Sequence, residues 1–333
     1  MISTEQVSDL LVRHWDVLGD GRPLPSRFSY LLITKGSEPG SKLVLLAFAS
    51  RESTPRLAIK LPRSKAQNAS LEAEYQNLRT VAPFATHGPV VTPTPLLCRA
   101  EDGWVWLAES VVDGSELGPA ALLPPRPVVD SVVDWLVHLG RSTLELRSTS
   151  AGAAELRELL ACAERYVTGG DERRVLDRAT EPLLMLDSQP LPRVFEQRDM
   201  GPWNLLVSRD GRIGVLDWES SCVGGYPVWD LFYFLAHCGF MVDRSADPRE
   251  RMQSFEQTFW GRHGFARTAR AALRRYVRGL GLREEWLGAL AAACWLHHTL
   301  SEVRRLDIRP SESLFWHMLT VTLDRNCALS CRA

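Results

Sequence analysis

The sequence predicts an α+β fold with two lobes, a small β-rich lobe followed by a larger, mainly helical one. Three observations support this prediction. The first third of the chain alternates short apolar runs with turns of Gly, Pro and Ser, as successive strands do. From Val128 onward, apolar residues recur at helical spacing. The 333 residues suffice for two modest lobes, which we predict over residues 1–112 and 113–333.

The N-terminal lobe is predicted to contain a meander of strands followed by one helix. Residues 35–41 (KGSEPGS) are predicted to form a turn between the first two strands, because Gly, Pro and Ser dominate them. After the third strand, the apolar residues of Ser70–Val81 are spaced for one face of a helix. The predicted strands are Arg27–Thr34, Lys42–Ser50, Leu57–Leu61, Pro95–Cys98 and Trp104–Glu109.

The C-terminal lobe is predicted to be helical apart from one hairpin. Helical spacing extends over Val128–Leu146 and Ala153–Val167, and over several helices from Arg249 to the end. In Arg193–Trp218, two short apolar runs flank a polar loop and an Asp210-Gly211 turn. This pattern is typical of a β-hairpin.

The overall composition excludes several classes of protein. Thirty-nine Lys and Arg nearly cancel forty Asp and Glu, for a formal net charge of -1, so we expect no nucleic-acid partner. The N-terminal residues of the chain have no long apolar run, so we expect no signal peptide, and no apolar run is long enough to span a membrane. Its seven cysteines include no Cys-x-x-Cys pair, which favours reduced thiols. We therefore expect a cytoplasmic protein that contacts no membrane.

Three polar residues around the predicted hairpin indicate a metal site. Asp199 and Asn204 lie in an irregular loop before the hairpin, and Asp217 ends its second strand. Because a hairpin brings the residues before its first strand close to those after its second, we expect these side chains to converge. Two carboxylates and an amide oxygen suit Mg²⁺, which completes its shell with phosphates and water.

The same three residues point to phosphoryl transfer. Asp199, Asn204 and Asp217, with a strand and an Asp-Gly turn between them, resemble the catalytic and metal-binding loops of the protein-kinase-like fold. Asp-Trp-Glu at 217–219 and the continuation GYPVWDL at 225–231 are similar to the aminoglycoside phosphotransferase and choline kinase superfamily. The resemblance implies a bilobal protein-kinase-like fold with ATP and Mg²⁺ between the lobes. In it Asp199 is the catalytic base, and Asn204 and Asp217 bind Mg²⁺.

The resemblance extends to the predicted third strand and the helix after it. Ala-Ile-Lys at 58–60 is similar to the strand that carries the phosphate-binding lysine, which implies that Lys60 contacts the α- and β-phosphates. Glu74 is then the ion-pair partner of Lys60, with Glu72 as the competing candidate. We prefer Glu74 because its spacing to Leu78 matches that of the superfamily.

Two further segments are implied to bind the nucleotide. The run Leu107–Gly114 resembles the hinge between the lobes, so the backbone of Glu109 and Val111 is expected to meet adenine. Residues 35–41 stand where the phosphate-covering loop is expected, with Gly36 and Ser37 as its nucleotide contacts. This loop contains no Gly-x-Gly-x-x-Gly pattern, as is common in the superfamily.

One departure from the family pattern leaves alternatives open. Gln197 precedes Arg198 and Asp199 where the superfamily has a histidine that packs structurally. Asp230 is implied to brace this loop from a neighbouring helix. One alternative is a catalytically silent nucleotide-binding pseudokinase or scaffold, for which Gln197 is the only support. The other is nucleotidyl transfer on the same fold.

We predict an ATP- and Mg²⁺-dependent phosphotransferase that phosphorylates a hydroxyl of a small molecule. The acceptor is expected to be a sugar, an aminoglycoside-like compound, an amino alcohol or a natural product. The chain between Asp217 and Pro227 is too short for the activation loop that protein kinases use to dock peptides. GTP in place of ATP, the acceptor and the oligomeric state stay open at this stage.

Overall fold

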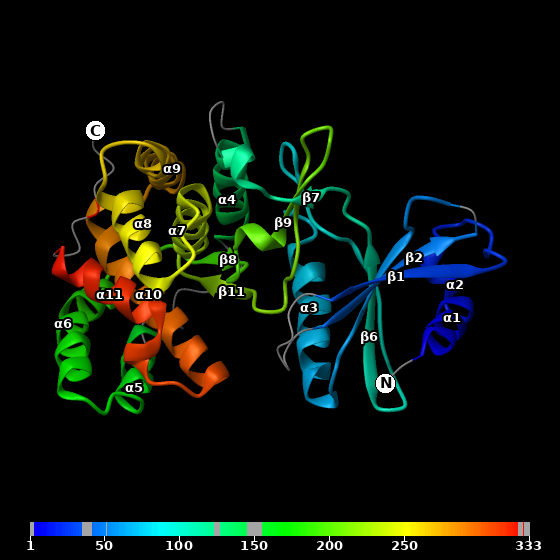
Figure 1. The fold of residues 1–333 in the computed structure, drawn as a ribbon, viewed down its shortest axis with the longest axis horizontal. Helices are drawn as coiled ribbons and strands as arrows, with labels where there is room; N and C mark the ends of the chain where they lie inside the picture. Colours follow the sequence, from blue (N-terminus) through cyan, green and yellow to red (C-terminus); the bar gives the residue numbers. More distant parts are fainter. Residues whose placement is uncertain are drawn as a thin grey trace. The chain divides into compact units, whose positions relative to one another are not determined.

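The computed structural model describes residues 3–34, 42–50, 52–122, 127–144, 155–325 and 329. The chain divides into two compact units, whose elements are labelled in Figure 1. Unit 1 comprises Met1–Glu116 and Asn204–Ser221, and unit 2 comprises Leu117–Trp203 and Cys222–Ala333. The predicted lobe boundary at residues 112 and 113 stays a prediction. A segment from the middle of the chain, Asn204–Ser221, thus folds with the N-terminal residues.

Unit 1 is built on an antiparallel sheet of five strands in the order β1-β2-β3-β6-β5. The three consecutive strands β1, β2 and β3 form the predicted meander. Side chains alternate between the two faces of such a sheet, and each face is covered by helices of unit 1. The strands are β1 (Phe28–Thr34), β2 (Leu43–Ala49), β3 (Leu57–Leu61), β5 (Pro95–Glu101) and β6 (Trp104–Ser110).

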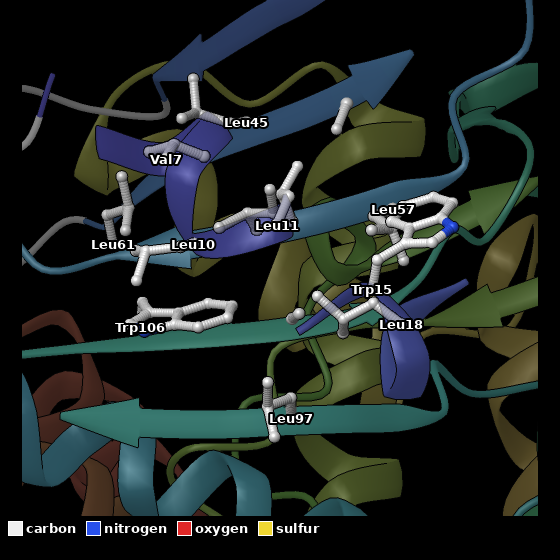
Figure 2. Packing of buried hydrophobic residues seen from close by; sticks show 13 residues of the cluster. Val7, Leu10, Leu11, Trp15, Leu18, Leu45, Leu57, Leu61, Leu97 and Trp106 are labelled. Atoms are coloured by element: carbon white, nitrogen blue, oxygen red, sulfur yellow. The ribbon is translucent and has the colours of Figure 1, made fainter. Parts of the chain in front are cut away.

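Two helices that the sequence analysis missed, α1 (Thr4–Arg13) and α2 (Trp15–Leu18), cover one face of this sheet. A capping box starts α1, in which the Ser3 and Gln6 side chains each accept a hydrogen bond from the other residue's backbone N–H. Figure 2 shows Leu11 of α1 among the apolar side chains of the sheet. The apolar stripe of α1 spans fewer than three helical turns. In an otherwise polar stretch of sequence, so short a stripe gives only a weak helical pattern.

The opposite face of the sheet packs against α3 (Asn68–Val81), which was predicted from its spacing. Leu71 is buried against Val105 and Leu107 of β6. Glu74 lies on the same buried side of the helix, and Figure 1 shows α3 running alongside the sheet. A carboxylate therefore enters a largely apolar interface, where it needs a charged partner.

The predicted hairpin is confirmed and forms part of a second sheet in unit 1, with the order β4-β10-β9-β7. Leu205 pairs with Val215 and Val207 pairs with Ile213, and Gly211 adopts a φ of 83° in the turn. The pairing of β10 with β4 and of β9 with β7 fixes the hairpin in unit 1. The strands are β4 (Val90–Val91), β7 (Ser115–Glu116), β9 (Leu205–Val207) and β10 (Ile213–Val215).

Unit 2 is mainly helical, as predicted, and contains one two-stranded sheet of β8 (Val194–Glu196) and β11 (Cys222–Gly225). The chain leaves it for unit 1 within the 3₁₀ turn η3 (Pro202–Asn204). The longer helices are α4 (Pro127–Thr143), α5 (Glu155–Glu164), α6 (Gly170–Asp187), α7 (Trp229–Asp243), α8 (Pro248–Trp260), α9 (Phe265–Leu280), α10 (Leu287–Leu306) and α11 (Leu314–Asp324).

Of these helices, α6 was not predicted, and α7 was expected only through the resemblance that placed Asp230 on a helix. Helix α6 contains Pro182 in its interior, and a proline there normally argues against a helix. Helix α7 is buried along nearly its whole length, so its apolar residues show no one-sided period. None of the described helices combines the length and apolar character required to cross a membrane.

The packing of α1 gives a first testable prediction. Leu11→Ala removes a side chain that is 0% exposed, and the cavity should lower the free energy of unfolding by about 2–5 kcal/mol. Val12→Ala, at the neighbouring position that is 49% exposed, is the control and should change it by less than about 0.5 kcal/mol. Urea unfolding followed by tryptophan fluorescence measures both. Equal effects of the two substitutions would contradict the packing of α1 on the sheet.

Candidate functional site

A buried ion pair joins the sheet and helix α3 in unit 1. Lys60, the fourth residue of β3, places its Nζ 2.6 Å from Oε1 of Glu74. Both side chains are buried, whereas Glu72 is exposed. Of the two candidate partners for Lys60, it is Glu74 that the structure places on the lysine. Glu74 Oε1 also accepts the backbone N–H of Trp218 at 3.1 Å.

Glu74 binds a second lysine that the sequence analysis did not assign. Lys42 Nζ donates to Glu74 Oε2 at 2.8 Å and lies 2.9 Å from both Asp217 Oδ1 and Glu219 Oε2. Burial alone would lower the pKa of Lys42, but these three carboxylates raise it. Burial alone would raise the pKa of Glu74, but Lys60 and Lys42 lower it to about 2. The carboxylate of Glu74 is therefore ionised between two ammonium groups.

Glu109 of β6 contributes its side chain to the same cluster. Its Oε1 lies 3.0 Å from Lys60 Nζ, and its Oε2 is buried without a hydrogen-bond partner among the described residues. Burial raises the pKa of Glu109 to about 7, although Lys60 opposes that shift. Because Lys60 is shared with the fully ionised Glu74, Glu109 is the carboxyl group that takes up a proton first. The sequence analysis considered only the backbone of this residue.

Asn204 and Asp217 stand at the same end of the hairpin in unit 1. The backbone N–H of Leu216 donates to the carbonyl oxygen of Asn204 at 2.9 Å, which brings the chain on either side of the two strands together. The Asp217 side chain is 37% exposed, and its φ of 60° is left-handed. Such backbone conformations cost about 1–3 kcal/mol and cluster at functional sites.

The donor atoms at this end of the hairpin fit a hard cation. Asn204 offers an amide oxygen, and Asp217 and Glu219 offer carboxylates, the last two shared with Lys42. Across the described part of the chain, no three His, Cys, Asp or Glu side chains gather into a metal site. Amide and carboxylate oxygens are ligands that Mg²⁺ accepts, and the ion completes its shell with phosphates and water.

Helix α3 also fixes the segment around Asp217. Asn77 Nδ2 donates to the Trp218 carbonyl oxygen at 2.8 Å, and Ser70 Oγ donates to Glu219. Trp218 is fully buried, and its Nε1 donates to the Val215 carbonyl oxygen at 3.0 Å. The residues that follow β10 are therefore bonded to the same helix that carries Glu74.

In unit 2, Asp230 of α7 organises the loop that contains Asp199. Its Oδ2 accepts the backbone N–H of Gln197 and its Oδ1 that of Arg198, each at 2.8 Å. Gln197 Oε1 in turn accepts the backbone N–H of Asp199 at 2.8 Å. Burial raises the pKa of Asp230 to about 6, although these N–H donors and Arg198 oppose the shift. Gln197 thus bonds the backbone of the next aspartate, a local role that the sequence did not reveal.

The Asp199 carboxylate itself is bonded by the hydroxyl of Tyr233, also on α7. Tyr233 is 8% exposed and belongs to an aromatic cluster with Trp203, His237 and Phe315. Burial lowers the pKa of His237 to about 3, so this imidazole is neutral near pH 7. Asp199 therefore lies beside an aromatic cluster in unit 2.

Comparison with known proteins shows the family to which this chain belongs. The sequence model described as the phosphotransferase enzyme family (APH) matches residues 46–273, more than half of the chain. This chain belongs to the phosphotransferase enzyme family. The predicted resemblance to the aminoglycoside phosphotransferase and choline kinase superfamily is therefore confirmed. No curated protein sequence matches it.

Solved structures from the same superfamily share the fold. A thermostable mutant of aminoglycoside phosphotransferase APH(4)-Ia, solved with AMP-PNP and hygromycin B, is 12% identical over 97% of this chain and 99% of that one, with a TM-score of 0.57. The GDP and kanamycin complex of APH(2″)-IIia is 14% identical over 95% and 98%, with a TM-score of 0.53. Choline kinase LicA from Streptococcus pneumoniae is 15% identical over 95% of each chain, with a TM-score of 0.55. The predicted α+β, protein-kinase-like fold is confirmed.

In this phosphotransferase the predicted site residues fall in both units. Asp199 lies in unit 2, so its convergence with Asn204 and Asp217 stays a prediction, as do the nucleotide contacts of Glu109 and Val111. Two predicted contacts, Gly36 and Ser37, lie outside the described residues. The predicted residues found in unit 1 are Lys60, Glu74, Glu109, Val111, Asn204 and Asp217.

The double ion pair of Glu74 should be central to stability. Glu74→Ala leaves two buried lysines without this carboxylate, and we expect the free energy of unfolding to fall by about 3 kcal/mol or more. Glu72→Ala removes an exposed carboxylate from the same helix and should change it by less than about 0.5 kcal/mol. Chemical unfolding in urea compares the two variants, and a similar loss in both would show that the buried pairing contributes little.

The buried carboxyl group of Glu109 should make stability depend on pH. Its pKa rises from an ordinary value of 4.5 to about 7 on folding, so the unfolded chain ionises this group first as the pH increases. Ionisation therefore disfavours the folded state from about pH 4.5 through pH 7. The free energy of unfolding of Glu109→Gln should exceed that of the parent protein by about 1–3 kcal/mol between pH 5 and pH 8. Urea unfolding at each pH measures this difference. Glu72→Gln serves as the control. If the stability difference between Glu109→Gln and the parent protein became smaller as the pH rises, the raised pKa of Glu109 would be refuted.

Proposed function

We propose that this phosphotransferase moves the γ-phosphoryl group of ATP to a hydroxyl of a small molecule, with Mg²⁺. The main support for this proposal is the set of contacts that Glu74 makes. Glu74 Oε1 binds both Lys60 Nζ, at 2.6 Å, and the backbone N–H of Trp218, the residue after Asp217, at 3.1 Å. One buried carboxylate thus aligns a lysine suited to phosphates with the segment suited to a metal, the two electrostatic groups that phosphoryl transfer needs.

The nucleotide role of unit 1 rests on Lys60. Its ammonium group is oriented by Glu74 and Glu109 and is suited to the α- and β-phosphates. Gly36 and Ser37 and the backbone of Glu109 and Val111 are proposed as further contacts. Related structures contain AMP-PNP and GDP, which supports nucleotide binding by the fold and leaves GTP as an alternative donor.

Asn204 and Asp217 would hold the Mg²⁺ ion through one amide and one carboxylate oxygen. The bound metal would neutralise charge on the phosphates during transfer. Hydrogen bonds hold these ligands in place. The carbonyl oxygen of Asn204 accepts the N–H of Leu216, and Asn77 of α3 bonds the chain directly after Asp217.

Asp199 is proposed as the catalytic base. Its carboxylate would orient the acceptor hydroxyl and take its proton as the oxygen attacks the γ-phosphorus in line. Asp230 and Gln197 fix the backbone on which Asp199 stands, and the hydroxyl of Tyr233 orients its carboxylate. A rigid base lowers the cost of reaching the geometry of attack.

The acceptor is proposed to be a small polar molecule that carries a hydroxyl group. Kanamycin and hygromycin B are present in two related structures, and a third relative is a choline kinase. The family therefore supports small-molecule acceptors, including aminoglycoside-like compounds and amino alcohols. The described cysteines form no disulfide bonds with one another, in keeping with a proposed cytoplasmic location, where ATP is available.

The catalytically silent alternative rests on Gln197, which replaces the usual histidine. In this chain its side chain accepts the N–H of Asp199, so the loop keeps an internal hydrogen bond and Asp199 is present. Active phosphoryl transfer is therefore the better interpretation. Nucleotidyl transfer is distinguished by the mass of the product.

The first experiment measures product formation from ATP and Mg²⁺ across a panel of aminoglycosides, sugars and amino alcohols. Asp199→Ala removes the proposed base and should lower the rate with a productive acceptor by about 10²–10⁴-fold. Asp171→Ala, which removes an aspartate whose side chain is 90% exposed on α6, is the matched control and should keep the parent rate.

Mass spectrometry of the acceptor decides among the outcomes. An added phosphate that disappears with Asp199→Ala would support the proposal, and an added nucleotide would point to nucleotidyl transfer. Parent-level turnover by Asp199→Ala would overturn the role of this residue. Tight nucleotide binding without product from a wide metabolite screen would favour the silent alternative.

A further inference from the structure

Lysine is rare in this chain and confined to one short segment. The sequence contains four lysines, Lys35, Lys42, Lys60 and Lys65, beside thirty-five arginines. Lys35 lies outside the described residues, and Lys65 is exposed. Elsewhere the chain uses arginine for every positive side chain. The ammonium group differs from a guanidinium in being a compact point charge, so the two buried lysines mark a place where that shape is required.

Both buried lysines bind the same carboxylate. Glu74 Oε1 accepts from Lys60 and Glu74 Oε2 from Lys42, at 2.6 and 2.8 Å. The side chains of Lys42 and Lys60 are each 9% exposed. The two ammonium groups therefore stand on either side of one carboxylate, and Lys42 directly follows residues 35–41 in the chain. A phosphate chain that meets Lys60 comes within a few ångströms of Lys42.

Lys42 also contacts the carboxylates that would bind the metal. Its Nζ lies 2.9 Å from Asp217 Oδ1 and 2.9 Å from Glu219 Oε2. A Mg²⁺ ion would bind an oxygen of Asp217 at about 2.0–2.1 Å. An ammonium group and a divalent cation on the same carboxylate repel each other strongly when both are shielded from water. The metal and Lys42 therefore compete for Asp217.

The cluster has more carboxyl groups than ammonium groups. In unit 1 two ammonium groups face four carboxyl groups, of Glu74, Glu109, Asp217 and Glu219. Lys42 thus supplies half of the positive charge of the unloaded cluster. The triphosphate of a nucleotide brings new negative charge to the same place, together with the metal that replaces Lys42 on Asp217.

We propose that Lys42 is a second phosphate-binding cation, which neutralises Asp217 and Glu219 in the nucleotide-free protein and transfers to the nucleotide phosphates when the nucleotide binds, so that Asp217 is released to the metal. This inference rests on the proposed nucleotide and metal roles of unit 1. It makes metal binding depend on the nucleotide, because the metal gains Asp217 only when phosphates draw Lys42 away.

The test measures metal and nucleotide binding separately, in the full chain. Mn²⁺ is titrated into nucleotide-free protein and followed by electron paramagnetic resonance, and AMP-PNP is titrated without metal by calorimetry. In Lys42→Gln the Mn²⁺ affinity should rise by about tenfold or more and the AMP-PNP affinity should fall by about tenfold, since one charge within this distance shifts the proton affinity of a carboxylate by about 1–3 pKa units. Lys65→Met removes an exposed lysine of unit 1 and should leave both affinities within about twofold.

A second measurement uses the unaltered protein, so that it does not depend on the folding of a variant. With four lysines, Lys35→Arg and Lys65→Arg identify the ¹⁵Nζ signals of those two residues in a lysine-labelled sample, and the two signals that remain belong to Lys42 and Lys60. Addition of AMP-PNP without metal should shift the Lys42 and Lys60 signals and leave the Lys65 signal in place. A shift of Lys60 without any shift of Lys42 would overturn the phosphate role of Lys42.

The remaining outcomes separate this inference from the proposed function. Unchanged Mn²⁺ affinity in Lys42→Gln would overturn the competition for Asp217. AMP-PNP binding that is equal in Lys42→Gln and in the parent, with normal binding in the parent, would overturn the role of Lys42 and leave the proposed function intact. Failure of the parent protein to bind AMP-PNP even with Mg²⁺ present would overturn both.

Discussion

The buried carboxylate of Glu74 is the interaction on which the candidate site of unit 1 depends. It neutralises Lys60 from β3 and Lys42 beside β2, and it accepts the backbone N–H of Trp218 after β10. Strand, helix and hairpin are thus joined through one side chain of α3. Because an ionised group away from water must be paired, the positions of the two lysines and of the Asp217 segment are determined together.

In unit 2, the buried carboxylate of Asp230 fixes a polar loop in the same way. Asp230 accepts two backbone N–H groups of the loop before Asp199, and Gln197 closes the same loop from within. Each unit therefore fixes its polar loop by hydrogen bonds to a buried carboxylate on a helix. The left-handed φ of 68° at Arg198 and of 60° at Asp217 shows that both loops have a constrained backbone.

Sequence reasoning recovered the parts of the molecule whose signals are local. The meander, α3 and the hairpin follow from apolar periods and turn residues, which act over a few neighbours. It missed α1, whose apolar stripe is short, and it reached the helix around Asp230 only through the family resemblance, because near-complete burial removes the one-sided pattern of α7. It also missed the side-chain roles of Lys42 and Glu109, because no local feature shows that residues so far apart in the chain meet at one lysine or one glutamate.

The sequence by itself determined the family and the order of the chemistry-bearing residues, because the spacing of Asp199, Asn204 and Asp217 and the lysine at 60 are properties of the chain alone. The tertiary structure decided which acid meets Lys60 and that Lys42 joins it. It also decided that the hairpin of Asn204–Ser221 folds with unit 1. The reason is physical: periodicity determines which face of an element is buried, whereas the partner of a buried charge depends on packing between elements distant in sequence.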